Sequence, residues 1–269
     1  MKTRKKLIFA FLALLIVLVP LYAANGQPRN PPERVDVIIE GRRIAAAVGD
    51  IVATGLRTAN GHCQFPSYLV EIGGNEPGYA STTMRATKNC QLVVTEIQRQ
   101  PFKEGVLPPS PEGDLQAPVE EGVSSGEAGT ADLAPDTVSA AAAVRRFGWA
   151  RESFYEQFGI TVTQTHSEMT YWDDGSKVYG GAEASPYCWW RSGTGWYLIS
   201  CTKTKSFSGP SAVRLSVKGT YDHSVFQIWH RTTATFTGRP GGVWNKACAF
   251  EGTIPPYWYT RCEGGSWVL

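Results

Sequence analysis

Short runs of alternating apolar and polar residues recur along most of this chain, with turn residues between them. Val213, Leu215 and Val217, for example, would share one face of a strand whose other face is polar. The Asp-Gly pair at 174–175 separates two such runs, as in a tight β-hairpin. This pattern predicts an all-β protein of antiparallel strands. One exception is residues 144–158, whose apolar positions fall near helical spacing and predict a single helix.

The first 26 residues have the layout of a secretory signal peptide. Four basic residues precede an unbroken run of 13 apolar residues from Leu7 to Val19, and small residues follow up to Gly26. Such a run is short for a membrane span and ordinary for a leader. We therefore expect residues 1–26 to be removed and the remainder to be secreted into an oxidising space. The alternative is an uncleaved leader that anchors the protein to a membrane.

Removal of this leader would change the net charge of the chain. The whole sequence carries +2, but the leader holds four of its 26 basic residues and none of its 24 acidic ones. The remainder, with 22 basic and 24 acidic residues, has a net charge of −2. It lacks the global basic excess that favours nucleic-acid binding, so no nucleic-acid partner is predicted. The absence of any Asn-x-Ser/Thr sequon favours a bacterial exported protein.

Composition divides the rest of the chain into three segments. Residues 27–100 hold short β-type runs and two cysteines, and residues 139–269 hold the other four cysteines and all nine Trp. Between them, residues 101–138 are rich in Pro, Gly, Ser and Ala, and carry eight acids against one base. Such a segment buries too little apolar surface to offset the entropy lost on ordering. We expect two small β-domains, the C-terminal one a disulfide-stapled sandwich, joined by a disordered linker. The alternative is one composite domain with a long insertion.

Six cysteines in an exported protein predict three disulfides. If Thr194 and Gly195 form the tip of a hairpin, Cys188 and Cys201 face each other across it. The last two cysteines repeat this design around residues 254–256. The predicted pairs are Cys63–Cys90, Cys188–Cys201 and Cys248–Cys262. Close Cys-x-x-Cys pairs and zinc-finger histidine spacing do not occur, so neither a metal nor another cofactor is predicted.

The density of aromatic residues in 139–269 is the main indication of function. Neighbouring residues on a strand point to opposite faces, so both rings of a doublet such as Trp189-Trp190 cannot enter one core. Exposed Trp and Tyr on a rigid sheet can stack on sugar rings. The residues predicted to bind a ligand are Trp172, Trp189, Arg191, Trp196, Tyr257, Trp258 and Tyr259. The competing interpretation is that two sheets bury most of these rings as core.

Sequence motifs for catalysis are absent. There is no Gly-x-Ser-x-Gly elbow, no His-Glu-x-x-His pair and no Gly-rich phosphate loop. We therefore expect a non-catalytic binding module, with carbohydrate of a cell wall or of the environment as the first ligand. A structural or interaction module that binds an envelope protein is the second expectation. The third is a hydrolase with a site around His166, His223 or His230, in which His166 could pair with Glu168.

Overall fold

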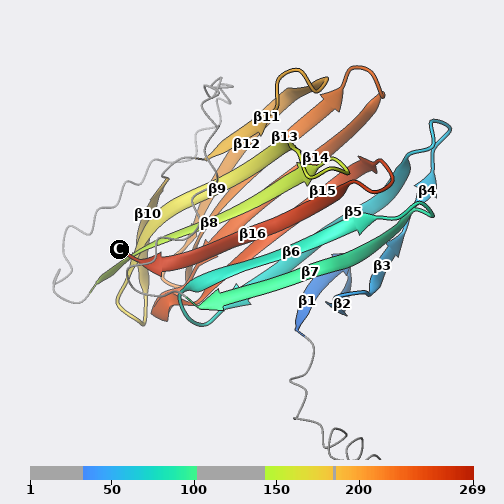
Figure 1. Ribbon diagram of the computed structural model, residues 1–269. Coiled ribbons are helices and arrows are strands. Elements are labelled where there is room, and N and C mark those ends of the chain that lie inside the picture. The colour runs from blue at the N-terminus through green and yellow to red at the C-terminus, as the bar shows by residue number, and fades with distance from the viewer. Residues whose placement is uncertain (1–32, 102–142, 184–185) are drawn as a thin grey trace, which may run out of the picture. The chain divides into compact units, whose positions relative to one another are not determined.

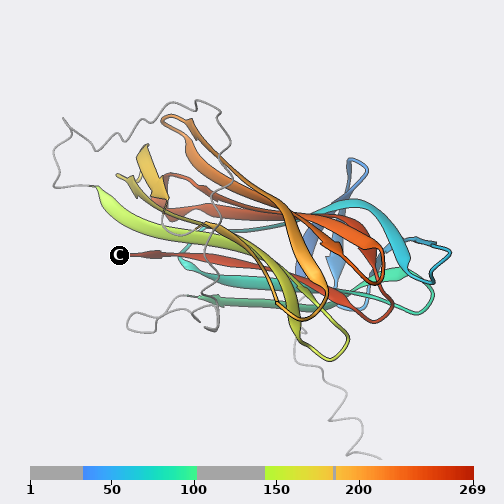
Figure 2. The same cartoon turned by 90° about the horizontal axis from the view of Figure 1, so that it is seen from above.

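The computed structural model describes residues 33–101, 143–183 and 186–269, and residues 34–269 cluster as one compact unit. The described residues are almost entirely antiparallel strand, arranged in two sheets (Figure 1). Figure 2 shows these sheets as two stacked layers. The predicted leader and almost all of the predicted linker lie outside the described residues. The all-β, antiparallel class is confirmed.

Sheet A contains eight strands. They are β1 (Arg34–Ile39), β2 (Arg42–Ala47), β4 (Leu56–Arg57), β5 (Cys63–Gly74), β12 (Trp196–Ser208), β13 (Ala212–His223), β14 (Ile228–Gly238) and β15 (Trp244–Ile254). Their order is β12-β13-β14-β15-β5-β1-β2, and β4 also pairs with β5. A short 3-10 turn, η1 (Pro240–Gly242), precedes β15.

Sheet B also contains eight strands. They are β3 (Ile51–Thr54), β6 (Gly78–Ala86), β7 (Gln91–Pro101), β8 (Val144–Tyr155), β9 (Thr161–Asp173), β10 (Val178–Glu183), β11 (Tyr187–Trp190) and β16 (Tyr259–Val268). Their order is β10-β9-β8-β16-β6-β7-β3, and β11 also pairs with β9. The two sheets pack face to face over one hydrophobic core, as in a β-sandwich.

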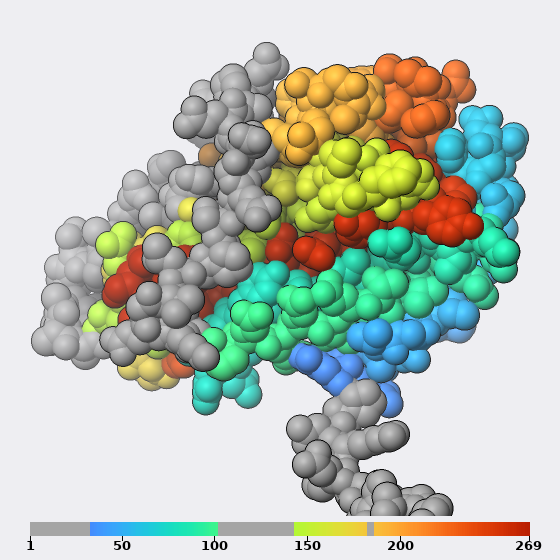
Figure 3. Space-filling view, viewed as in Figure 1, coloured from blue at the N-terminus to red at the C-terminus, as the bar shows by residue number. Residues whose placement is uncertain are grey.

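Strands from both halves of the chain share both sheets. In sheet A, β5 pairs with β15, and in sheet B, β16 lies between β6 and β8. Figure 3 shows β16 in red between the green atoms of β6 and the yellow-green atoms of β8. The described residues therefore form the composite domain, with the acidic segment inserted between β7 and β8, and not two separate domains. The N-terminal segment alone would form a marginal core, and its strands complete theirs with C-terminal partners.

Residues 144–158, predicted to form a helix, instead form β8 and part of the following turn. Pairing with β9 and β16 along both edges outweighs the weak helical periodicity. Gly148 leaves room for the ring of Phe236 from the facing sheet, which a Cβ at this position would overlap. Among the segments that the structure describes, we find no helix that could cross a lipid bilayer.

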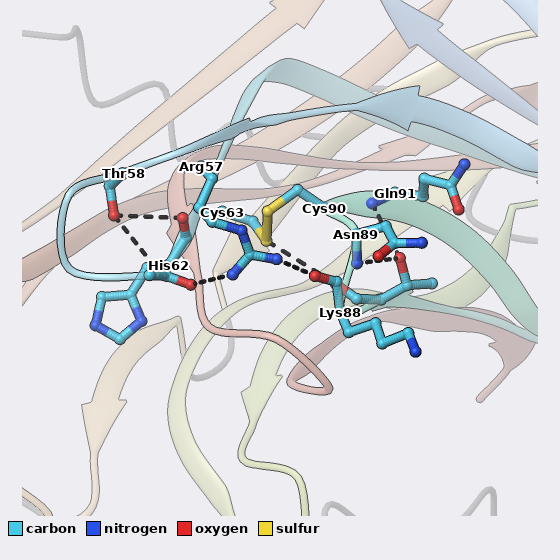
Figure 4. Close-up of a disulfide and its surroundings, with 10 residues drawn as sticks. Arg57, Thr58, His62, Cys63, Lys88, Asn89, Cys90 and Gln91 are labelled. Carbon is cyan, nitrogen blue, oxygen red and sulfur yellow. Dashed lines mark hydrogen bonds between the residues drawn. A yellow bond between two sulfur atoms is a disulfide. The ribbon is translucent and has the colours of Figure 1, made fainter.

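All three predicted disulfides are confirmed, and each joins sheet A to sheet B. Cys63 on β5 bonds Cys90 in the turn between β6 and β7 (Figure 4). Cys188 on β11 bonds Cys201 on β12, with Cα atoms 5.9 Å apart. The hairpin geometry predicted for this pair is wrong, because β11 pairs with β9 and β12 pairs with β13. The chain crosses between the sheets in this turn. The third pair likewise connects β15 with β16 across the sandwich.

The interior of the sandwich contains polar groups as well as a hydrophobic core. Thr165 on β9 shares hydrogen bonds with the hydroxyls of Tyr221 (3.0 Å) and Thr232 (2.6 Å) on sheet A. The Lys246 ammonium is fully buried and donates to the carbonyl oxygens of Ala80 and Cys262. These bonds replace the hydrogen bonds to water that the groups lose when they are buried.

Candidate binding surface

The outer face of sheet B carries the side chains that alternate with its core positions. On β8, Ala150 and Phe154 belong to the core, so Trp149, Arg151 and Tyr155 point away from it. Trp149 is 3% exposed, yet it is not part of the core cluster. Its ring packs instead against neighbours on the outer face. This face is thus built from large side chains that cover one another.

Five outer-face residues align in one row across the strands near the turn that follows β8. Tyr259 on β16 pairs in register with Arg85 on one side and with Tyr155 on the other, and Tyr155 pairs with Thr161. Arg191, just after β11, donates from Nε to the Thr161 carbonyl oxygen over 2.9 Å. We call this set (Arg85, Tyr259, Tyr155, Thr161 and Arg191) the tyrosine row. It places one arginine at each end of a stacked tyrosine pair.

The five arginine–aromatic contacts found among the described residues all lie on this face. The pairs are Arg85–Tyr259 (4.8 Å from guanidinium to ring centre), Arg145–Trp172 (5.9 Å), Arg151–Trp149 (5.5 Å), Arg191–Trp189 (5.6 Å) and Arg261–Tyr155 (5.6 Å). Cations over aromatic faces gain electrostatic attraction and lose side-chain freedom. The guanidinium groups are therefore held in place on the sheet.

A cluster of charged residues occupies the centre of the same face. Arg151 binds the Glu263 carboxylate over 2.6 Å, and the Tyr79 hydroxyl donates to its other oxygen over 2.9 Å. His166 Nε2 lies 2.9 Å from the Glu168 carboxylate, and the His166 ring stacks on Tyr187. Burial lowers the pKa of His166, while its bond to Glu168 opposes that shift. The cluster is largely buried and its charged groups are paired, although His166 Nδ1 is buried without a hydrogen-bond partner, and this burial favours a supporting role.

The arginines of this face differ in their acidic partners. Arg151 pairs with Glu263, and Arg261 pairs with Glu96 over 3.2 Å. Within the described residues, Arg85, Arg145 and Arg191 have no such carboxylate partner. Apart from Arg191 Nε, which donates to the Thr161 carbonyl oxygen, their N–H groups are therefore available to a ligand that carries negative charge.

The structure brings together some of the residues predicted to bind a ligand and separates others. Four of the seven, Trp172, Trp189, Arg191 and Tyr259, lie on the outer face of sheet B. Trp196, expected to share a face with Trp189, is 3% exposed in the core, because β12 belongs to the other sheet. Trp258 also packs against the core, and Tyr257 is exposed in the turn between β15 and β16.

Other residues of this face were missed from the sequence. Trp149, Arg151 and Tyr155 alternate along β8. This alternation was not used because the segment was expected to form a helix. Arg85 and Arg261 gave no local signal, because their aromatic partners come from other strands.

The candidate catalytic histidines do not converge. His166 lies on the outer face of sheet B, whereas His230 lies between the sheets, 2.8 Å from the Thr163 hydroxyl. Burial lowers the pKa of His230 to about 3, so its ring is neutral near pH 7. His223 packs on Trp196, and its Nδ1 accepts two backbone N–H bonds in the next turn. The His166–Glu168 pair does form, but its ring is almost fully buried.

One group of potential metal ligands is present in the core. A Glu152 carboxylate oxygen and the sulfur atoms of Cys248 and Cys262 all lie within 4.8 Å of one another. Both sulfur atoms belong to a disulfide, and metal binding requires thiolates. In this oxidised form the group does not fit a metal ion.

The outer face of sheet A has a different character. Arg231 there pairs with Glu251, and Trp229 is partly exposed without a described arginine over its ring. A shallow hollow of about 540 Å³ lies beside Ile38 and Leu69. The arrangement of arginines on aromatic rings is thus specific to sheet B among the described residues.

Comparison with protein-family models, with curated proteins and with solved structures finds no match to this chain.

Proposed function

We propose that this protein is an exported, non-catalytic binding module that holds an acidic polysaccharide on the outer face of sheet B. The observation that supports this proposal is the concentration of five arginine–aromatic pairs on one face. The polysaccharide would belong to a cell wall or to the environment, in keeping with export.

The chemistry of the face suits a sugar that carries carboxylate groups. A guanidinium presents planar, forked N–H donors that match a carboxylate, and the ring beneath it fixes its plane. Arg85 and Arg191 lie over aromatic rings in this way at the two ends of the tyrosine row, and neither pairs with a carboxylate of the described residues. The partly exposed Tyr155 and Tyr259 rings between them offer apolar edges and hydroxyls to sugar rings.

The spacing of the tyrosine row favours a chain of sugars over a single one. Arg85 and Arg191 are separated by four inter-strand steps of about 4.8 Å, or roughly 19 Å. A ligand that contacts both arginines must therefore be extended. The rigid sheet lowers the entropy lost on binding such a ligand.

A binding assay with a charged polysaccharide and its neutral counterpart tests this proposal. The full chain should bind polygalacturonate more tightly than its methyl-esterified form, and added salt should weaken the binding. Arg85→Gln and Arg191→Gln should each weaken it about tenfold, the effect expected for one charge-assisted contact. Arg214→Gln is the matched control, because Arg214 is exposed on the outer face of sheet A. It should leave binding unchanged.

Three outcomes would count against the proposal. Binding of neutral glycans with equal affinity would keep a carbohydrate ligand but remove the acidic class. Retention of no glycan at all, or equal losses in all three variants, would overturn the assignment. Capture of a defined envelope protein at the same arginines would then favour the protein-interaction alternative.

A further inference from the structure

Six turns of the sandwich meet at one end. Strand register places them together, since Ile254 pairs with Cys63, and Tyr259 pairs with both Tyr155 and Arg85. Trp196 likewise pairs with His223 at this end. In Figure 1 this is the right-hand end of the strands, away from the C-terminus. We call the turns 58–62, 87–90, 156–160, 191–195, 224–227 and 255–258, together with the adjoining strand β4 (Leu56–Arg57), the loop end.

Three apolar side chains at this end, two in turns and one on β4, are strongly exposed, and we call them the apolar tips. Phe158 is 80% exposed, Leu56 77% and Val225 72%, the three largest values for big hydrophobic side chains in the described part of the chain. Phe226 and Tyr257, in turns of the same end, are also exposed. Single exposed apolar residues are ordinary, but a cluster at one end marks an interaction surface.

The turns at the opposite end of the strands have another composition. Residues 75–77, 174–177, 209–211 and 239–243 are mostly Asp, Asn, Ser, Gly and Pro, with a few charged residues. The exposed apolar residues near that end, Phe207 and the terminal pair 268–269, lie outside its turns. Turn structure itself therefore does not require the apolar tips of the loop end.

The loop end also carries an excess of positive charge. Arg57 on β4 and Lys88 and Arg191 in the turns lie there against one acid, Glu156, so the described loop end has a net charge of +2. The Arg57 guanidinium donates to the Gly61 and Lys88 carbonyl oxygens, which fixes the two turns together (Figure 4). Positive charge next to apolar tips complements an anionic lipid surface.

We propose that the loop end docks on an anionic lipid bilayer, with Leu56, Phe158 and Val225 entering the boundary between headgroups and acyl chains. The apolar tips come from β4 and from two separate turns and form isolated projections, which suit a fluid bilayer better than a preformed protein pocket. The disulfide Cys63–Cys90 holds the turns 58–62 and 87–90 together, and the disulfide Cys188–Cys201 closes the loop that contains the turn 191–195. This site shares Arg191 with the tyrosine row, but its apolar side chains are not part of the polysaccharide surface and the docking does not require polysaccharide binding.

A dye placed at the loop end measures this docking directly. The full chain with Val225→Cys, labelled with an environment-sensitive fluorophore, is mixed with vesicles of phosphatidylcholine with or without phosphatidylglycerol. We expect a rise in fluorescence that requires the anionic lipid and is quenched by a quencher within the acyl region. The matched control is the same dye at Asn75→Cys, an exposed turn position at the opposite end. It should not respond.

Substitutions at the other two tips test whether they insert. In the Val225-labelled chain, Leu56→Ser combined with Phe158→Ser should reduce vesicle partitioning by at least about tenfold. Both side chains are exposed, so thermal unfolding should be unchanged. The apolar run at residues 7–19 is present in every variant, and its own membrane affinity cannot move the dye at position 225 into lipid selectively. A response equal at positions 75 and 225, no response at 225, or an unaltered response in the Ser variant would overturn the proposal.

Discussion

Tyr155 and Tyr259 stack across β8 and β16 with ring centres 4.7 Å apart and planes within 6° of parallel. Arg85 lies over the ring of Tyr259, and Arg261 lies over the ring of Tyr155. The two rings therefore hold two arginines that come from different strands. This arrangement connects the packing of the outer face with the position of its positive charges.

Removal of one stacked ring should disturb binding more than folding. Tyr155→Ala deletes the platform of Arg261 and half of the stack, so we expect weaker binding of polygalacturonate, by roughly fivefold to tenfold. The lost ring pair should lower the free energy of unfolding by about 1 kcal/mol, in addition to the cost of the apolar area that the half-buried ring no longer covers. Urea titration and calorimetry measure the two effects. Tyr155→Phe keeps the ring and should bind nearly as well as the parent, and an equal loss in Phe and Ala would contradict a stacking role.

Trp189 and Trp196 should respond differently to the same substitution. Trp189 supports Arg191 on the outer face, so Trp189→Ala should weaken polysaccharide binding about as much as Arg191→Gln does. Because both act through one contact, the double variant should lose little more than either single variant. Trp196 lies in the core against Phe154, and Trp196→Ala should destabilise the fold by about 3–5 kcal/mol. Additive losses in the Trp189–Arg191 cycle would rule out the supporting role.

The disulfide pairing could be predicted because each pair is close in sequence, with separations of 13, 14 and 27 residues. Its geometry could not, since a tight turn within a sheet and a turn between sheets have similar compositions. The turn at 191–195 crosses from β11 to β12, and this crossing reverses the face of Trp196. Local alternation therefore predicts the face of neighbouring residues such as Trp189 and Arg191, but not that of Trp196 beyond the crossing.

The composite domain could not be predicted from local sequence patterns for a related reason. The pairing of β5 with β15 joins residues far apart in sequence, and the sequence of neither strand identifies the strand it pairs with. The same holds for Arg85 and Tyr259, whose contact depends on β6 lying beside β16. Alternation predicts which face a side chain takes, and tertiary register decides which side chains meet there.

The disulfide between Cys188 and Cys201 should affect both stability and the binding surface. It closes a short loop that contains Trp189 and Arg191, and it holds β11 to the edge of the sandwich. Cys188→Ser combined with Cys201→Ser should cost up to about 3 kcal/mol of unfolding free energy. It should also weaken polysaccharide binding, because Arg191 loses its fixed position. Loss of stability with unchanged binding would show that Arg191 does not depend on this constraint.

The buried carboxyl of Glu152 should make stability depend on pH. Burial raises its pKa to about 8, although a hydrogen bond from Thr260 and the nearby Lys246 ammonium oppose the shift. In the unfolded chain the same carboxyl has a pKa of about 4.3. Between these two values the folded state binds the proton that the unfolded state has released. The free energy of unfolding should therefore fall as pH rises from about 4.5 to 8, by at most about 1.4 kcal/mol per pH unit from this group.

Glu152→Gln isolates this contribution, because glutamine keeps the shape of the protonated carboxyl and does not titrate. Burial lowers the pKa of Lys246, so this group changes the free energy of unfolding in the opposite direction as pH rises. Because Lys246 is present in both proteins, its contribution cancels in their difference. The difference in unfolding free energy between Glu152→Gln and the parent should thus grow in favour of the variant between pH 5 and 8. Denaturant titrations at half-unit pH steps measure it. A constant difference across this range would mean that Glu152 is already ionised in the folded protein, paired with Lys246.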